Sequence, residues 1–264
     1  MTTLHVRFPW IVSFASALLF LGVAIVGTPI GSQIEQAANL PINSGIIIQQ
    51  LFLVIFSALM VALFGGWRKA GFHHPLQFQA LLLTLPMLVA PILLLFLSGI
   101  SVVDPQQILM LVIFTAMIGF AEEALCRGVI LGAFLKRGPF QAALISSVIF
   151  GSMHLINLFY GMDISTALLY VVYASLIGFG FAAPYIRSGG AIWPMIIVHA
   201  LYDFLGKMGH NWGTQAQPTT SIDILVRLTV AVLVGIYGFW LLKQKRTLAE
   251  PVPSEPGSNS LSAA

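Results

Sequence analysis

Eight long apolar runs, separated by short polar segments, dominate the chain. They cover residues 9–30, 44–65, 77–98, 107–135, 140–158, 165–186, 191–206 and 222–242. A helix needs about 20 apolar residues to cross the hydrocarbon core of a bilayer, and helices satisfy their own backbone hydrogen bonds there. The pattern therefore predicts an all-α, polytopic integral membrane bundle of about eight transmembrane helices.

Composition supports this class and excludes others. The chain is 58% hydrophobic and 8% charged, whereas soluble domains carry roughly 25% charged residues. The net charge of +3 is typical of basic loops that flank membrane spans, so we expect no nucleic-acid partner. Cys126 is the single cysteine, which excludes an intramolecular disulfide and a cysteine metal pair.

The positive charges fall on one side of the predicted membrane. With eight spans, that side receives Arg7, Arg68, Lys69, Lys136, Arg137, Arg187, Lys243, Lys245 and Arg246. The other side receives Lys207, with Arg227 close to it inside the last run. Basic loops stay in the cytoplasm, so we expect both termini to be cytoplasmic. A chain this short, with such short loops, is typical of a prokaryotic cytoplasmic membrane.

We divide the chain into four parts. Residues 1–105 are N-terminal transmembrane helices, 106–206 a catalytic core, 207–246 the last transmembrane helix, and 247–264 a disordered cytoplasmic tail. The tail assignment follows from its Pro, Ser, Gly and Glu residues.

The stretch AEEALCRG, residues 121–128, places three charges inside an apolar run. Glu123 and Arg127 are four residues apart with the glutamate first, which favours a helical ion pair. We interpret this pair as structural. Glu122 lies about 100° around the helix from Glu123 and lacks a partner in its own helix. An unpaired carboxylate within a membrane is a candidate general base.

A tight turn near Gly138 predicts where Glu122 finds a partner. Glu122 precedes Gly138 by 16 residues and His154 follows it by 16, so an antiparallel hairpin is expected to hold both at one depth. His199 follows a turn at residues 188–190 and Asp203 lies one helical turn further. Alternatives remain for each: a histidine bonded to a helix carbonyl or a serine, and an aspartate at a helix end.

These residues resemble a known family. Glu122-Glu123-x-x-x-Arg127 resembles the EExxxR motif of the CAAX protease and bacteriocin-processing (CPBP, or Abi) family of intramembrane proteases, which includes the CAAX prenyl protease 2-like members. Phe150-x-x-x-His154 and His199-x-x-x-Asp203 resemble its second and third motifs. The resemblance covers about residues 106–206.

The resemblance implies roles for the site residues. Glu122 and His154 would activate the attacking water, while His199 and Asp203 would stabilise the oxyanion or position the carbonyl. Asp203 stands where better-studied members have Asn, so it would need a proton or a different role. A zinc ion held by Glu122, His154 and His199 is the alternative; we favour a glutamate-activated water without metal, in a hydrated cavity open to the cytoplasm.

The function predicted from these features is that of an intramembrane endopeptidase. Its partners would be the lipid bilayer and a peptide or membrane-protein substrate, of CAAX type or another membrane peptide. The alternatives are a non-catalytic scaffold or bacteriocin-immunity factor of the same fold, and a small transporter with a proton-relay glutamate. A transporter would be expected to carry internal repeats, and we find none.

Overall fold

The computed structural model describes residues 7–72, 78–209 and 221–244, and every regular element within them is helical. In the N-terminal part these are α2 (Pro9–Ala37), α3 (Ser44–Met60), η1 (Val61–Gly65), η2 (Arg68–Phe72), α4 (Phe78–Thr84), η3 (Leu85–Leu88) and α5 (Val89–Ser98). They are followed by α6 (Pro105–Glu123), η4 (Ala124–Leu131), α7 (Gly132–Phe134), η5 (Leu135–Arg137), α8 (Pro139–Met153), η6 (His154–Leu158), α9 (Ile164–Arg187), α10 (Trp193–Met208) and α11 (Ser221–Lys243).

Seven of the described helical stretches are long and apolar enough to cross a membrane. They are Pro9–Ala37, Ser44–Phe64, Phe78–Leu97, Pro105–Arg137, Pro139–Leu158, Ile164–Arg187 and Ile224–Lys243. Each coincides with one of the apolar runs, which confirms the predicted all-α polytopic bundle.

The remaining predicted span, residues 191–206, is the exception. It forms α10, which has 16 residues and is too short to be counted with the seven. It nevertheless runs the length of the bundle: Ile192 at its start lies beside Gly71, and the Met208 carbonyl at its end accepts a hydrogen bond from the Ser101 amide. Helix α10 carries polar residues that lipid would not accommodate, so it packs against other helices. It can therefore be shorter than a helix that lipid surrounds.

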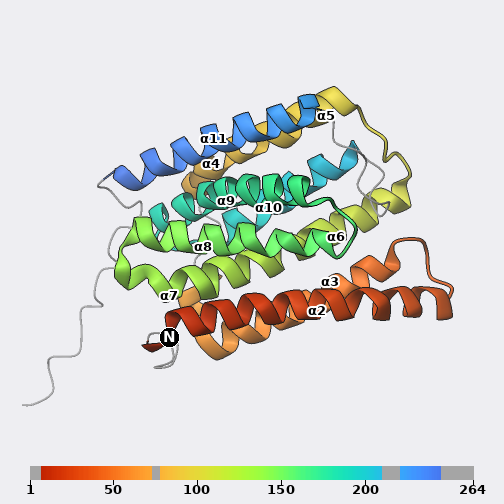
Figure 1. Cartoon of the computed structure of the whole chain (residues 1–264), viewed down its shortest axis with the longest axis horizontal. Helices are drawn as coiled ribbons and strands as arrows, with labels where there is room; N and C mark the ends of the chain where they lie inside the picture. Colours follow the sequence, from red (N-terminus) through yellow and green to blue (C-terminus); the bar gives the residue numbers. More distant parts are fainter. Residues whose placement is uncertain (1–6, 73–77, 210–220, 245–264) are drawn as a thin grey trace, which may run out of the picture.

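The bundle has two chemically different ends (Figure 1). The start of α2, the α7–α8 turn and the end of α11 lie together at one end, left in Figure 1. We call it the basic end, because Arg68, Lys69, Lys136, Arg137, Arg187 and Lys243 lie in its elements. The opposite end carries η6, the first half of α9 and the second half of α10.

Glycines allow the helices that carry the polar residues to approach closely. A methyl group added at Gly119 of α6 would lie 2.7 Å from the Ile196 carbonyl oxygen of α10. One added at Gly151 of α8 would lie 2.5 Å from the Val171 carbonyl oxygen of α9. Both distances are too short for real carbon–oxygen contacts, so α6–α10 and α8–α9 meet backbone to backbone at these points.

One large buried core joins the N-terminal helices to the later ones, with Phe20, Leu53, Leu125, Phe150 and Met195 among its members. The four-part division of the chain therefore remains a prediction, and the tail assigned to residues 247–264 lies outside the described residues.

Candidate active site

Glu123 and Arg127 form the ion pair that their spacing predicts. Arg127 Nε lies 3.1 Å from Glu123 Oε2, and both side chains are almost completely buried. The contact is an ion pair and not a well-aligned hydrogen bond. Arg127 also donates to the Gly178 carbonyl oxygen of α9 at 2.9 Å, and its guanidinium lies 5.2 Å from the centre of the Phe150 ring of α8. The pair therefore ties three helices together.

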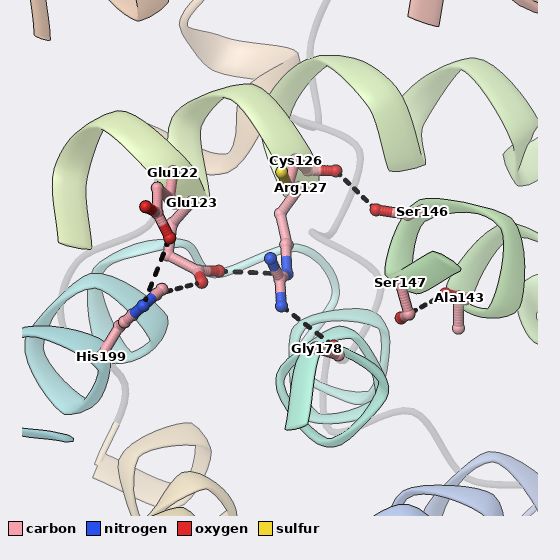
Figure 2. Close-up of polar contacts among 9 residues, drawn as sticks. All are labelled: Glu122, Glu123, Cys126, Arg127, Ala143, Ser146, Ser147, Gly178 and His199. Atoms are coloured by element: carbon pink, nitrogen blue, oxygen red, sulfur yellow. Dashed lines mark hydrogen bonds and ion pairs between the residues drawn. The ribbon is translucent and has the colours of Figure 1, made fainter. Parts of the chain in front are cut away.

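Glu123 has a second role that its spacing from Arg127 does not reveal. Its other oxygen, Oε1, lies 2.7 Å from His199 Nδ1 (Figure 2). A carboxylate only accepts hydrogen bonds, so His199 Nδ1 carries a hydrogen and donates it. The imidazole also stacks on the Phe181 ring, with centroids 5.2 Å apart. Glu123 and Phe181 together fix the orientation of His199, and they leave its Nε2 facing Glu122.

Glu122 contacts His199 and not the histidine that the hairpin predicts. Glu122 Oε2 lies 3.6 Å from His199 Nε2, and its side chain is 23% exposed, whereas that of Glu123 is fully buried. Among the hydrogen bonds and ion pairs of the described residues, none joins Glu122 to His154. The direct contact of Glu122 is therefore with His199, so two neighbouring glutamates lie beside the two nitrogens of one ring; joint action of Glu122 and His154 on a water stays a prediction.

The register of the hairpin explains the difference. Ser146 Oγ donates to the Cys126 carbonyl oxygen at 2.8 Å. Ser146 follows Gly138 by eight residues, whereas Cys126 precedes it by twelve, so equal residue counts on the two helices do not give equal depths. The chain from Ala124 to Leu131 forms a π-helix, not an α-helix. A π-helix puts more residues into each turn, so counting residues at the α-helical rise overestimates how far Glu122 lies from the turn.

His154 ends α8 and begins η6. Its Nδ1 lies 3.1 Å from the Phe150 carbonyl oxygen, which is the helix-carbonyl contact considered as an alternative role. A carbonyl only accepts, so Nδ1 carries the hydrogen and Nε2 of the neutral ring is an acceptor. The bond thus fixes the tautomer and leaves one ring nitrogen for another partner.

Asp203 lies one turn beyond His199 on α10 and is partly exposed. It is close enough to interact electrostatically with Glu122, His154 and His199. Lys207, a further turn along α10, is within electrostatic range of Glu122 and His154. The fold therefore gathers the predicted catalytic residues into one neighbourhood, although their pairing differs from the expected one.

Comparison with known families agrees with this geometry. The family model described as "Type II CAAX prenyl endopeptidase Rce1-like" matches residues 104–205, which include all three motifs. Residues 104–205 are an Rce1-like domain. The resemblance to the CAAX protease family is thereby confirmed for this part of the chain. No curated protein and no solved structure matches the chain.

The alternative zinc site of the Rce1-like domain does not assemble in the described residues. No group of three His, Cys, Asp or Glu side chains among them is arranged to hold a metal ion. Of the three proposed ligands, Glu122 and His199 are neighbours, while His154 bonds to its own helix. The choice between a zinc ion and a metal-free site stays a prediction, because His154 keeps its Nε2 for another partner.

Residues of the Rce1-like domain are less buried towards the end of the bundle that carries η6. From Glu123 to Phe134, running towards the basic end, every residue is buried. In α10 the buried positions end at His199, and residues 201–209 are all at least partly exposed. A helix with one buried face alternates between buried and exposed positions, and residues 201–209 lack this alternation. The whole of η6 is likewise partly exposed.

The cytoplasmic location of both termini and the cytoplasmic opening of the site stay predictions. Sequence reasoning also missed the second contact of Glu123 and the π-helix. No local signal marks a contact between residues 76 positions apart, and the π-helix has no pattern distinct from an α-helix at this length.

Proposed function

We propose that the protein is an intramembrane endopeptidase in which Glu122 activates a water molecule. The Rce1-like family is a protease family, and the seven apolar helices make this chain an integral membrane protein. The observation that carries the proposal is the partly exposed carboxylate of Glu122, held against an imidazole whose other nitrogen is fixed by a buried ion pair.

The reaction assigned to this site is a two-stage hydrolysis. Glu122 takes a proton from water while the water oxygen attacks the carbonyl carbon of the peptide bond, which gives a tetrahedral oxyanion. The carbon–nitrogen bond then breaks, and the proton on Glu122 passes to the leaving nitrogen. The products are a carboxylic acid and an amine, which exchange a proton to become a carboxylate and an ammonium ion, so no other reactant is required.

The neighbouring histidines have different tasks in this scheme. His154 presents an acceptor nitrogen, because its Nδ1–H is bound to the Phe150 carbonyl, and it accepts one hydrogen of the attacking water. His199, with Nδ1–H bound to Glu123, presents Nε2; when that nitrogen is protonated it donates to the oxyanion.

Asp203 takes the role that its charge allows. An ionised carboxylate repels an oxyanion, so direct contact with it is excluded. It lies one helical turn from His199 on α10, within electrostatic range of the imidazole. Asp203 is therefore a positioning residue in this proposal.

The test compares membrane peptides of cells expressing the wild type and the Glu122→Gln protein. We expect specific peptides to disappear and their precursors to accumulate in the variant, with equal amounts of folded protein in both. His154→Ala and His199→Ala should give the same peptide pattern. A Glu122→Gln protein that processes the same peptides, or that complements a deletion fully, would instead support a non-catalytic scaffold. Metal analysis of the purified protein tests the metal-free mechanism, which predicts activity that survives chelation.

A further inference from the structure

Arg227 is a charged residue inside the last membrane span, and the active site does not use it. It lies in α11, outside the residues 104–205 that match the family model. Its guanidinium carbon lies 6.0 Å from the centre of the Tyr170 ring and 5.9 Å from that of the Tyr173 ring, both on α9. An arginine that snorkels extends towards water, whereas Arg227 is held against two rings of a neighbouring helix. These contacts fix the position of its charge.

The packing of α9 and α11 places Arg227 level with Tyr170. Near the basic end, Arg187 of α9 donates to the carbonyl oxygen of Gln244, just after α11, at 3.0 Å and across an offset of 57 residues. Arg227 and Tyr170 are separated by the same offset. The two helices therefore run parallel in one register, and the contact of Arg227 with α9 is built into their packing.

The length of α11 sets the depth of Arg227 in the membrane. Arg227 precedes Gln244 by 17 residues, which is about 25 Å along a helix. Lys243 and Arg187 mark the basic end of this helix pair, and such charged residues lie at the level of the lipid headgroups. The hydrocarbon core is about 30 Å thick, so Arg227 lies close to its opposite boundary, next to the lipid headgroups of that leaflet.

A small pocket lies beside Arg227, between α9 and α11. Its polar lining comes from Thr166, Tyr170, Tyr173 and Arg227, and its apolar lining from Leu169, Ile224 and Leu228. The pocket encloses about 20 Å³, which is room for one water-sized group. It is too small for a whole headgroup or a peptide side chain. It can take one oxygen of a larger group that stays outside.

Two buried donors at this pocket have no acceptor. Tyr173 Oη and Arg227 Nε are buried, and neither has a hydrogen-bond partner among the described residues. Tyr173 interacts electrostatically with Arg227, but the two groups are not aligned for a hydrogen bond. No carboxylate of the described side chains lies within ion-pair distance of Arg227. Because buried donors without acceptors cost stability, the pocket favours an anionic oxygen, which accepts from both groups.

We propose that this pocket binds the phosphate group of a membrane phospholipid. Arg227 and Tyr173 donate to one phosphate oxygen, and the apolar lining contacts the adjoining part of the lipid. An arginine guanidinium matches the geometry of phosphate oxygens, and the depth of Arg227 is that of the lipid phosphates. The bound lipid joins α11 to α9 of the Rce1-like domain and takes no part in the hydrolysis.

Native mass spectrometry of the full-length protein in detergent measures lipid binding without any enzymatic activity. With dioleoylphosphatidylglycerol as the probe, we expect the wild type to retain one lipid. Arg227→Gln should bind it about 10- to 100-fold more weakly, because a charged hydrogen bond is lost. Tyr173→Phe removes only a hydroxyl and should weaken binding by about 2- to 10-fold. Dioleoylglycerol, which has the same chains and no phosphate, should not be retained.

Two control variants decide whether the site is specific. Lys243→Gln removes a positive charge from the other end of α11 and should retain the lipid. An equal loss in Lys243→Gln and Arg227→Gln would show diffuse attraction between charges and would overturn the proposal, as would equal retention of dioleoylglycerol. Asp223 precedes Arg227 by four residues in the sequence. Unchanged binding in Asp223→Asn supports the proposal, whereas binding about tenfold tighter would identify Asp223 as the anion beside Arg227 and overturn it.

Thermal unfolding keeps the test decisive if Arg227→Gln folds poorly. Reaction of the buried Cys126 thiol with a maleimide dye reports unfolding, and Tyr173→Phe keeps every charge. Dioleoylphosphatidylglycerol should raise the unfolding midpoint of the wild type, and it should raise that of Tyr173→Phe less. Inorganic phosphate alone should raise neither. Equal protection of both proteins by the lipid overturns the assigned contact, and protection by inorganic phosphate as strong as that by the lipid overturns the lipid as its source.

Discussion

Adjacent glutamates with opposite roles provide the sharpest test of the site. Glu123→Gln removes one negative charge and keeps the shape of the side chain, and Glu122→Gln makes the same change one residue earlier. We expect the first substitution to destabilise the fold and the second to leave its stability nearly unchanged. The reason is that Glu123 is fully buried between Arg127 and His199, whereas Glu122 is 23% exposed and makes one 3.6 Å contact.

The magnitude follows from what each substitution leaves behind. Removing one partner of a buried ion pair costs about 3–5 kcal/mol, because the remaining charge stays desolvated and unpaired. In a protein of this size each kcal/mol shifts the unfolding midpoint by about 2–4 °C, so Glu123→Gln should lower it by roughly 6–20 °C by the same relation. A partly exposed ion pair contributes about 0–1 kcal/mol, so Glu122→Gln should shift the midpoint by less than about 4 °C.

The buried thiol of Cys126 supplies the assay. It is completely inaccessible in the folded protein and belongs to the residue next to Arg127. A maleimide dye that fluoresces on reaction will therefore report when heating opens the core in detergent. Glu122→Gln is the matched control, since it has the same chemistry on the neighbouring residue.

A double variant separates unpaired charge from loss of packing. Glu123→Gln combined with Arg127→Met leaves no unpaired charge, so it should be more stable than Glu123→Gln alone. If Glu123→Gln unfolds within 2 °C of the wild type (a shift of under about 1 kcal/mol), the buried pair does not stabilise the fold and the reasoning is refuted.

Three further predictions concern packing, charge and capping. Gly119→Ala should lower both activity and the unfolding midpoint, because its methyl group would push α10 and His199 away from α6; Gly22→Ala, with open space around it, is the control that should change neither. Asp203→Asn should lower turnover with little effect on the midpoint, since it removes charge but not shape; turnover equal to wild type would contradict a charge role. Hydrogen bonds from Ser165 and Thr166 lower the pKa of the exposed Asp163 carboxyl. The capping of α9 by Asp163 is therefore complete above the ordinary pKa of about 3.9 and is lost as pH falls through the lowered pKa. Hydrogen exchange at the Thr166 amide should be slow at neutral pH and faster in acid, and it should be fast at both pH values in Asp163→Ala.

The sequence alone determined which segments cross the membrane and which polar residues lie inside it. Apolar runs must be about 20 residues long to cross hydrocarbon, so their number and position can be counted directly. The Glu123–Arg127 pair was equally predictable, because residues four apart on a helix are always neighbours.

Only the tertiary structure decided how the polar residues pair. The contact of Glu122 with His199 depends on the π-helix after Glu123 and on the close approach of α6 and α10 at Gly119. Depth within a membrane is set locally by chain length and hydropathy, whereas facing and access are set by packing between helices far apart in the sequence.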